Sequence, residues 1–137
     1  MPNLTMTEAE IYQLVIDCLL ANQCNRDNAE ALARTISHAE RDGCASHGLF
    51  RMPGYIASLR SGKVDGCATP SVERISPAVV RVDGHGGYAP LALERGRDAL
   101  IAAARENGIA AMALVNLHHF AALWAAVSYT HLRAHET

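Results

Sequence analysis

Apolar residues recur at helical spacing in the first third of the chain. The first stripe follows Thr7-x-x-Glu10, which has the form of a capping box. Its members are Ile11, Leu14, Val15, Cys18 and Leu19. A second stripe, formed by Ala29, Leu32, Ala33 and Ile36, runs toward Gly43, which can adopt the left-handed conformation of a helix C-cap. The pattern predicts two antiparallel helices that bring the chain to Ser46.

An irregular segment is predicted after the second helix. Proline is favoured in the first turn of a helix, so we expect an irregular turn through His47–Met52 and a helix over Pro53–Arg60. Ser46 can cap a new turn, which would place His47 and Arg51 one turn apart on the same face. A proton donor would then lie beside a carboxylate clamp. Spacing alone leaves an alternative open, in which Ser46 only caps, His47 is half exposed and Arg51 lies on a solvated face.

Two short runs of β-branched residues indicate the start of a sheet. Val72–Ile75 and Val79–Val82 are separated by Ser76-Pro77 and predict two strands. Asp83–Gly87 is predicted to turn the chain tightly into the next helix. The alternative is that this glycine-rich segment holds a phosphate at the helix N-terminus, although it matches neither G-x-G-x-x-G nor a P-loop.

A long helix and one more strand complete the pattern. Apolar spacing predicts a helix over Pro90–Asn107, ended by Gly108. Ile109–Val115 is a continuous apolar run, which is typical of a strand covered on both faces. Strand, helix and strand in succession imply parallel pairing. We therefore predict an α/β fold, in which N-terminal helices are followed by the start of a mixed or parallel sheet with a crossover helix.

The composition argues against two classes of partner, nucleic acids and membranes. The 137 residues are 50% hydrophobic and carry a formal charge of −2, which is typical of a globular protein and indicates no basic patch for nucleic acid. The longest apolar run is too short to span a bilayer, and the N-terminus lacks a signal-type pattern. We therefore expect no nucleic-acid or membrane partner and a cytoplasmic protein.

The cysteines and histidines predict no metal site. The four cysteines lack a Cys-x-x-Cys pair, which argues against zinc and against a disulfide framework. They are Cys18, Cys24, Cys44 and Cys67. His118-His119 follow the last strand, at the carboxyl end where open α/β sheets bind ligands. Metal binding is a minor alternative there, because neighbouring side chains diverge and no acidic or thiol residue completes a ligand set.

Two separated motifs carry a family resemblance. Ser46-His47-Gly48, Arg51 and Met52-Pro53-Gly54-Tyr55 come first, and His118-His119-Phe120-Ala121-Ala122-Leu123-Trp124 come later. Together they resemble the malate/L-lactate dehydrogenase family, which is distinct from the Rossmann-fold lactate dehydrogenases. Within it, the sequence is most similar to the Δ1-piperideine-2-carboxylate/Δ1-pyrroline-2-carboxylate reductases. The resemblance runs from about Thr7 to Ala126 without obvious gaps.

The resemblance implies a reaction and a role for each residue of the first motif. The reaction is reduction of a C=N or C=O bond next to a carboxylate, with hydride from NADPH, or from NADH as the alternative. Arg51 would hold the carboxylate through two parallel hydrogen bonds. His47 would donate the proton, and Ser46 would orient His47.

The second motif is implied to line the cofactor site. Its residues there are His118, His119, Phe120, Ala121 and Ala122. His119 also matches a residue assigned acid/base work in some members of the family. Leu117 departs from the small polar residue common in this motif, which puts cofactor contacts at that position in doubt.

We expect three parts in the chain. Residues 1–70 form a helical segment with the Ser-His-Gly-x-x-Arg motif, and residues 71–126 begin the α/β cofactor-binding part. Residues 127–137 depart from the family and resemble a translated sequencing adapter. The natural gene is therefore expected to continue, so that this chain is about the first third of an enzyme and inactive alone. The alternative is a short polar natural C-terminus.

The expected function is that of an NAD(P)H-dependent oxidoreductase. It would reduce a cyclic 2-imino acid to the L-amino acid, and by family resemblance it would be a homodimer at full length. One alternative is a malate, L-lactate or ureidoglycolate-type dehydrogenase of the same family, with a 2-oxo acid as its small-molecule partner. The other is a non-catalytic helical module.

Overall fold

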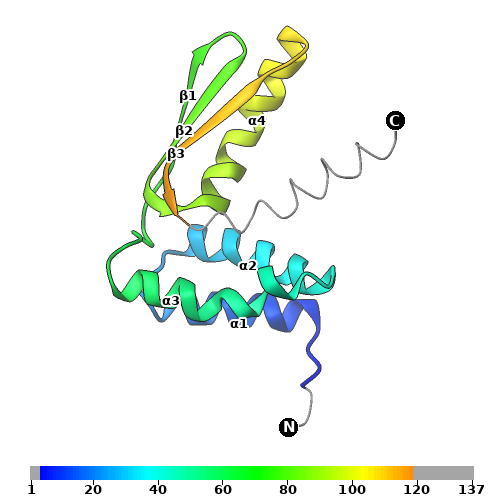
Figure 1. Cartoon of the computed structure of the whole chain (residues 1–137), viewed down its shortest axis with the longest axis vertical. Coiled ribbons are helices and arrows are strands. Elements are labelled where there is room, and N and C mark those ends of the chain that lie inside the picture. Colours follow the sequence, from blue (N-terminus) through cyan, green and yellow to red (C-terminus); the bar gives the residue numbers. More distant parts are fainter. Residues whose placement is uncertain (1–3, 119–137) are drawn as a thin grey trace.

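The computed structural model describes residues 4–118, which form two layers (Figure 1). The lower layer in this view holds the helices α1 (Glu8–Leu20), α2 (Arg26–Arg41) and α3 (Met52–Arg60). The upper layer holds the strands β1 (Ser71–Ser76), β2 (Val79–Tyr88) and β3 (Ala111–His118), together with α4 (Ala89–Asn107). The predicted order of helices, sheet and crossover helix is confirmed.

α1 begins at the predicted capping box. The Thr7 hydroxyl accepts a hydrogen bond from the Glu10 backbone N–H at 3.2 Å, and the Glu10 carboxylate accepts one from the Thr7 backbone N–H at 2.7 Å. The backbone and hydroxyl hydrogen bonds from Thr7 hold the pKa of the Glu10 carboxyl below its ordinary value. The first turn of α1 is therefore fixed by a purely local sequence signal.

The buried face of α1 differs from the predicted stripe. Three of the predicted residues are buried, namely Ile11, Val15 and Leu19. Leu14, however, is 42% exposed, and Ile16 is buried in its place. At 100° per residue, Ile11 and Ile16 bound the face that packs on the rest of the layer, whereas Leu14 lies beyond Ile11 on the solvent side.

α2 runs back along α1. Asn25 caps α2 by accepting a hydrogen bond from the Asn28 backbone N–H, and Gly43 follows α2 with a φ of 73°. Arg41, at the end of α2, lies 3.5 Å from Glu8, at the start of α1, which confirms the antiparallel arrangement. Residues from all three helices of this layer form one core, including Val15, Ile16, Leu19, Leu32, Ile36, Tyr55 and Leu59.

The sheet is mixed, with the strand order β1-β2-β3. β1 and β2 are antiparallel, whereas β2 and β3 are parallel as predicted. α4 packs on one face, where Val80 and Val82 are completely buried. The prediction that the last strand is covered on both faces is wrong for the described residues. Ala111 and Ala113 of β3 are exposed, because α4 covers only the opposite face.

β2 is longer than predicted. The pairing of Asp83 with Val115 is followed directly by that of Gly87 with Leu117, so β2 carries two more residues than β3 in this interval. His85, with a φ of 49°, and Gly86, with a φ of 82°, take up the extra length. The predicted tight turn at Asp83–Gly87 is therefore an irregularity inside a strand, and the chain enters α4 only at Ala89.

Polar contacts join the layers, among them one made by Arg34 and one made by Tyr88. The Arg34 guanidinium of α2 donates from Nε and Nη2 to the Glu94 carboxylate of α4, at 2.9 and 2.6 Å. The Tyr88 hydroxyl donates to the Tyr55 carbonyl at 3.0 Å, and the two rings pack edge to face with centroids 5.6 Å apart. Burial raises the pKa of the Tyr55 hydroxyl to about 12. Tyr55 lies in the first turn of α3, directly after the loop that carries the predicted site, so the tyrosine contact joins the layers close to that loop.

Within residues 4–118, no helix is long and apolar enough to cross a membrane.

Candidate functional site

The loop over residues 44–51 carries the residues of the first motif. It consists of two 3-10 turns, Ala45–His47 and Leu49–Arg51, separated by Gly48. The predicted irregular turn and the helix after it are confirmed, because α3 begins at Met52. The predicted capping role of Ser46 is wrong: Ser46 lies inside the first turn, which has no side-chain cap.

Ser46 joins the other two site residues. Its hydroxyl oxygen lies 3.0 Å from Nδ1 of His47, and its carbonyl accepts a hydrogen bond from Nε of Arg51 at 2.8 Å. His47 and Arg51 are therefore brought together through Ser46. The prediction placed them on one face of a single helical turn, but Gly48 interrupts that turn.

The three site residues are all at least partly accessible to solvent. Ser46 and Arg51 are exposed, and His47 is partly buried, as the solvated alternative also predicted. Among residues 4–118, neither Nε2 of His47 nor the two Nη atoms of Arg51 have a hydrogen-bond partner. A planar carboxylate can be held by two Nη atoms in parallel, while an adjacent ring nitrogen exchanges a proton. The loop thus offers the two groups that reduction next to a carboxylate requires.

A second polar group lies at the carboxyl ends of β2 and β3. The Asp83 carboxylate accepts hydrogen bonds from the His85 backbone N–H and from the Asn116 side-chain amide, each at 2.9 Å. Chiefly the His85 N–H, and then the Asn116 amide, hold the pKa of Asp83 below its ordinary value. His85 and Asn116 both have positive φ, at 49° and 54°, which is uncommon for residues other than glycine.

This group lines a pocket of about 570 Å³. The lining residues are His85, Gly86, Asn116, Leu117 and His118. The volume lies in the range of small-molecule sites, and the carboxyl ends of parallel strands are the usual place for them. Leu117 packs against Gly84, where a Cβ would collide with it, so the unusual residue of the motif is used for packing.

The remaining residues of the second motif lie outside the described part of the chain. They are His119, Phe120, Ala121, Ala122, Leu123 and Trp124, and the predicted tail over residues 127–137 lies outside it as well. Their roles stay predictions. Within residues 4–118, no hydrogen bond joins the Ser46–Arg51 loop to the His118 pocket. Nor do three His, Cys, Asp or Glu side chains gather there in a way that could hold a metal ion.

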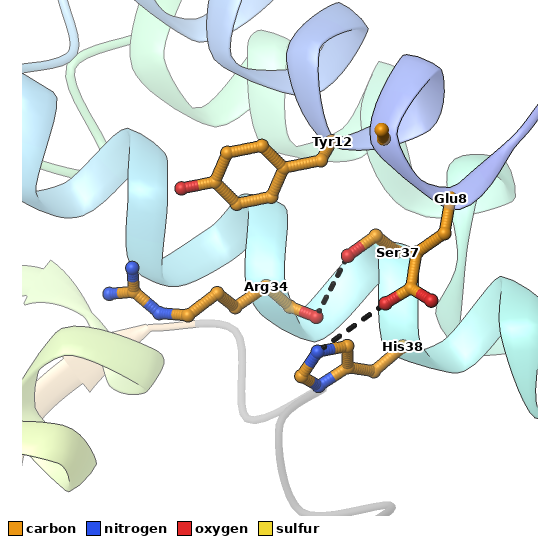
Figure 2. Close-up of a pocket in the computed structure, with 6 residues that line it drawn as sticks. Glu8, Tyr12, Arg34, Ser37 and His38 are labelled. Atoms are coloured by element: carbon orange, nitrogen blue, oxygen red, sulfur yellow. Dashed lines mark hydrogen bonds and ion pairs between the residues drawn. The ribbon is translucent and has the colours of Figure 1, made fainter.

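Another hollow, of about 470 Å³, lies between α1 and α2 (Figure 2). His38 Nε2 lies 3.6 Å from the Glu8 carboxylate, and the Ser37 hydroxyl donates to the Arg34 carbonyl. The Arg34 guanidinium is already held by Glu94. Each charged group here already has a partner, inside the hollow for Glu8 and His38 and outside it for Arg34, so this hollow is best explained as packing between helices.

Sequence reasoning missed three residues that shape the two polar groups. Asp83 had a weak signal, because an aspartate two residues before a left-handed residue commonly bonds that residue's N–H. Asn116 had none, since its partner is far away in the sequence. Glu40 accepts a hydrogen bond from the Leu49 backbone N–H at 2.7 Å, and no local sequence pattern predicts this contact.

Comparison with known proteins decides the family. The family model for malate/L-lactate dehydrogenase matches residues 6–131. The chain belongs to this family. It is 53% identical over 117 residues to the Δ1-pyrroline-2-carboxylate reductase of Ancylobacter novellus, covering 85% of this chain and 34% of the relative. It is also 44% identical to a (2R)-3-sulfolactate dehydrogenase (NADP(+)) of Chromohalobacter salexigens, with the same two shares.

Comparison with solved structures agrees with the family assignment. The crystal structure of the Δ1-piperideine-2-carboxylate reductase from Pseudomonas syringae pv. tomato superposes with a TM-score of 0.86 at 42% identity. The match covers 90% of this chain and 37% of that structure. The chain thus spans about a third of the length of the relatives it matches. The predicted family and fold class are confirmed.

Proposed function

We propose that this chain forms part of an oxidoreductase that reduces a cyclic 2-imino acid, such as Δ1-pyrroline-2-carboxylate or Δ1-piperideine-2-carboxylate, to the L-amino acid. The observation that carries the proposal is the Ser46, His47 and Arg51 group, in a chain 53% identical to a Δ1-pyrroline-2-carboxylate reductase. A reduced nicotinamide cofactor would supply the hydride. NADPH is the proposed form and NADH the alternative, since one relative is named for NADP(+).

Arg51 would hold the substrate carboxylate. Its Nε is fixed on the Ser46 carbonyl, so the guanidinium plane is set before substrate arrives and both Nη atoms can donate in parallel. Fixing the carboxylate also fixes the position of the adjacent C=N bond. This preorganisation lowers the entropy cost of reaching the reactive geometry.

His47 would protonate the substrate nitrogen. In the protonated ring, Nδ1–H donates to the Ser46 hydroxyl oxygen, which leaves Nε2–H as the proton that can be released. After transfer, the neutral ring keeps its proton on Nδ1 and the bond to Ser46 is preserved. Ser46 would thus select the nitrogen from which the proton leaves.

The pocket at the carboxyl ends of β2 and β3 is the proposed place for part of the cofactor. Its volume of about 570 Å³ exceeds that of a nicotinamide ring, and His118 and Asn116 line it with polar groups. His119, Phe120, Ala121 and Ala122 would complete it. A cytoplasmic location and a homodimer at full length belong to the same proposal. Light scattering on the full-length enzyme would test the dimer.

The second candidate is a 2-hydroxy acid dehydrogenase. The 44% identity to a sulfolactate dehydrogenase favours it specifically, because a 2-oxo acid would use the same carboxylate clamp and the same proton donor. The difference would lie in the atom that His47 protonates, oxygen in place of nitrogen.

The proposal is testable in a chimera in which residues 6–118 replace the corresponding part of the A. novellus reductase. We expect NADPH oxidation with Δ1-pyrroline-2-carboxylate, and a chimera that prefers oxaloacetate or pyruvate would favour the second candidate.

Two substitutions in this chimera test the roles of Arg51 and His47. Arg51→Ala should raise the KM for the imino acid by about tenfold or more, since a charged hydrogen-bonded pair is lost. His47→Gln should lower kcat by about a hundredfold.

Matched variants separate these effects from general damage. Arg60→Ala removes another exposed arginine of the same region, which bonds only Asn22 among the described residues, and should leave KM unchanged. His38→Gln removes a histidine of α2 paired with Glu8 and should leave kcat unchanged. If Arg51→Ala behaved like Arg60→Ala, the clamp assignment would be wrong.

A further inference from the structure

Glu40 stands in an electrostatically unfavourable place. It belongs to the last turn of α2, where the partial negative charge of the helix end disfavours a carboxylate. Among residues 4–118 it forms no ion pair that would offset this cost. Within that part of the chain its carboxylate accepts one hydrogen bond, from the Leu49 backbone N–H at 2.7 Å, nine residues along the chain. The Glu40 side chain therefore interacts with the loop that carries the site, and not with its own helix.

The Leu49 N–H needs such a partner. Leu49 begins the second 3-10 turn, and the first N–H groups of any helical turn have no acceptor within the turn. The residue before it is Gly48, which has no side chain to cap the turn. The Glu40 carboxylate takes over the function of an N-cap from a different element.

Because Gly48 has no side chain, the space beside it is open to this carboxylate. A Cβ added at Gly48 would lie 2.8 Å from Cγ of Glu40 and would overlap its carboxylate oxygen Oε1. The end of a glutamate side chain can move away, but it would then lose the Leu49 N–H. Gly48 and Glu40 are therefore coupled, since a side chain at one position expels the carboxylate of the other.

We propose that Glu40 is a positioning residue of the active site, which fixes the loop between His47 and Arg51 through the Leu49 N–H and the space left open by Gly48. The two 3-10 turns place the proton donor before Gly48 and the carboxylate clamp after it, so the angle between these groups is set at the junction that Glu40 holds. The catalytic part of this inference rests on the function proposed above; the hold of Glu40 on the loop does not.

The first test follows the Leu49 amide proton of the 137-residue chain by NMR. In Glu40→Ala, its hydrogen exchange should speed up by about tenfold to a hundredfold, because a bond to a charged acceptor is lost. Glu40→Gln retains an acceptor oxygen and should restore most of the protection. Gly48→Ala should match Glu40→Ala, and the double variant should be no worse than either single one. Additive effects in the double variant, or unchanged exchange in Glu40→Ala, would overturn the proposal.

The second test uses the chimera with the A. novellus reductase. Glu40→Ala should lower kcat/KM for Δ1-pyrroline-2-carboxylate by about tenfold to a hundredfold, as misplaced reacting groups do, while the KM for NADPH stays constant. Glu40→Gln should recover most of the loss. Glu30→Ala is the control, since Glu30 lies on the same helix and pairs only with Arg26 and Arg34 among the described residues.

The two tests distinguish failure of the proposed function from failure of the proposed role of Glu40. A chimera inactive before any substitution would count against the proposed function, while the amide exchange still decides whether Glu40 holds the loop. Faster exchange in Glu40→Ala with unchanged kcat/KM would overturn the positioning role and leave the proposed function intact. A loss of thermal stability shared equally by Glu40→Ala and Glu40→Gln, without a kinetic difference between them, would mean that Glu40 is only structural.

Discussion

The helical layer and the sheet layer enclose their apolar residues differently. Among the described residues, twelve buried residues of the helical layer and its adjoining segments form one cluster together with Tyr88 of β2, whereas the sheet and α4 contribute a second cluster of four. Three helices can surround a side chain, but a single helix covers only one face of a sheet. Leu32 of α2 is accordingly inaccessible to solvent, while Leu114 of β3 is partly buried. Tolerance to substitution should therefore differ between the layers.

The largest contrast is expected between two leucines. Leu32→Ala should lower the free energy of unfolding by about 3 kcal/mol, because it leaves a closed cavity. Leu114→Ala should cost about 1 kcal/mol, since part of this side chain is already in water. Urea unfolding followed by circular dichroism would measure both. Equal costs would mean that the sheet is as well enclosed as the helices.

Substitution by alanine should change the free energy of unfolding in opposite directions at two glycines of the two layers. A Cβ at Gly96 of α4 would lie 2.6 Å from a Val82 methyl group and overlap the Met112 sulfur, so Gly96→Ala should destabilise by about 1–2 kcal/mol. At Gly54 of α3 no atom lies within 4 Å of an added Cβ. Gly54→Ala should therefore stabilise by about 0.5 kcal/mol through helix propensity. Thermal unfolding of both variants is the measurement, and a stabilised Gly96→Ala variant would contradict the close packing of α4 on the sheet.

The tyrosine contact between the layers should have a smaller effect. Tyr88→Phe removes the hydroxyl that donates to the Tyr55 carbonyl and should cost about 1 kcal/mol. Tyr12→Phe is the control, because among residues 4–118 the Tyr12 hydroxyl bonds no other group. If the two variants were equally stable, the buried hydrogen bond would contribute nothing to the docking of the layers.

The smallest effects should come from ion pairs. Arg34→Ala should cost about 0.5 kcal/mol, because its two bonds to Glu94 are partly exposed and screened by solvent. Arg95→Ala breaks a single contact with Asp27, in which both side chains are more than half exposed, and should cause no measurable change. The cost of Arg34→Ala should shrink in high salt. A cost that does not depend on salt would assign the effect to packing of the arginine stem.

Local signals in the sequence predicted most of the secondary structure. The Thr7–Glu10 capping box, the left-handed Gly43 and Gly108 and the proline near the start of α3 each act within a few residues, so their effect can be read without knowing the fold. Parallel pairing of β2 and β3 was predictable for the same reason, because a helix between two strands leaves little alternative.

Features decided by distant partners were not predictable. Gly84–Gly86 contain every signal of a turn, yet the pairing of Gly87 with Leu117 keeps them within β2. The burial of Ile16 in place of Leu14 depends on how α1 is rotated against its neighbours. In the candidate site, residue types and family resemblance pointed to Ser46, His47 and Arg51. The bonds that join them run through a carbonyl and a ring nitrogen, which no residue pattern specifies.

The parallel pairing of β2 with β3 has a consequence for synthesis of the chain on the ribosome. The helices α1, α2 and α3 need only neighbouring segments and can form as soon as residue 60 has emerged. The free edge of β2 must wait for the whole of α4 and β3, about 30 residues later, which takes roughly 2–6 s at cellular elongation rates. During that interval, β2 is paired along its other edge with β1, while the edge that β3 will occupy stays open. A chaperone that binds extended apolar segments should therefore meet this protein at Val79–Tyr88.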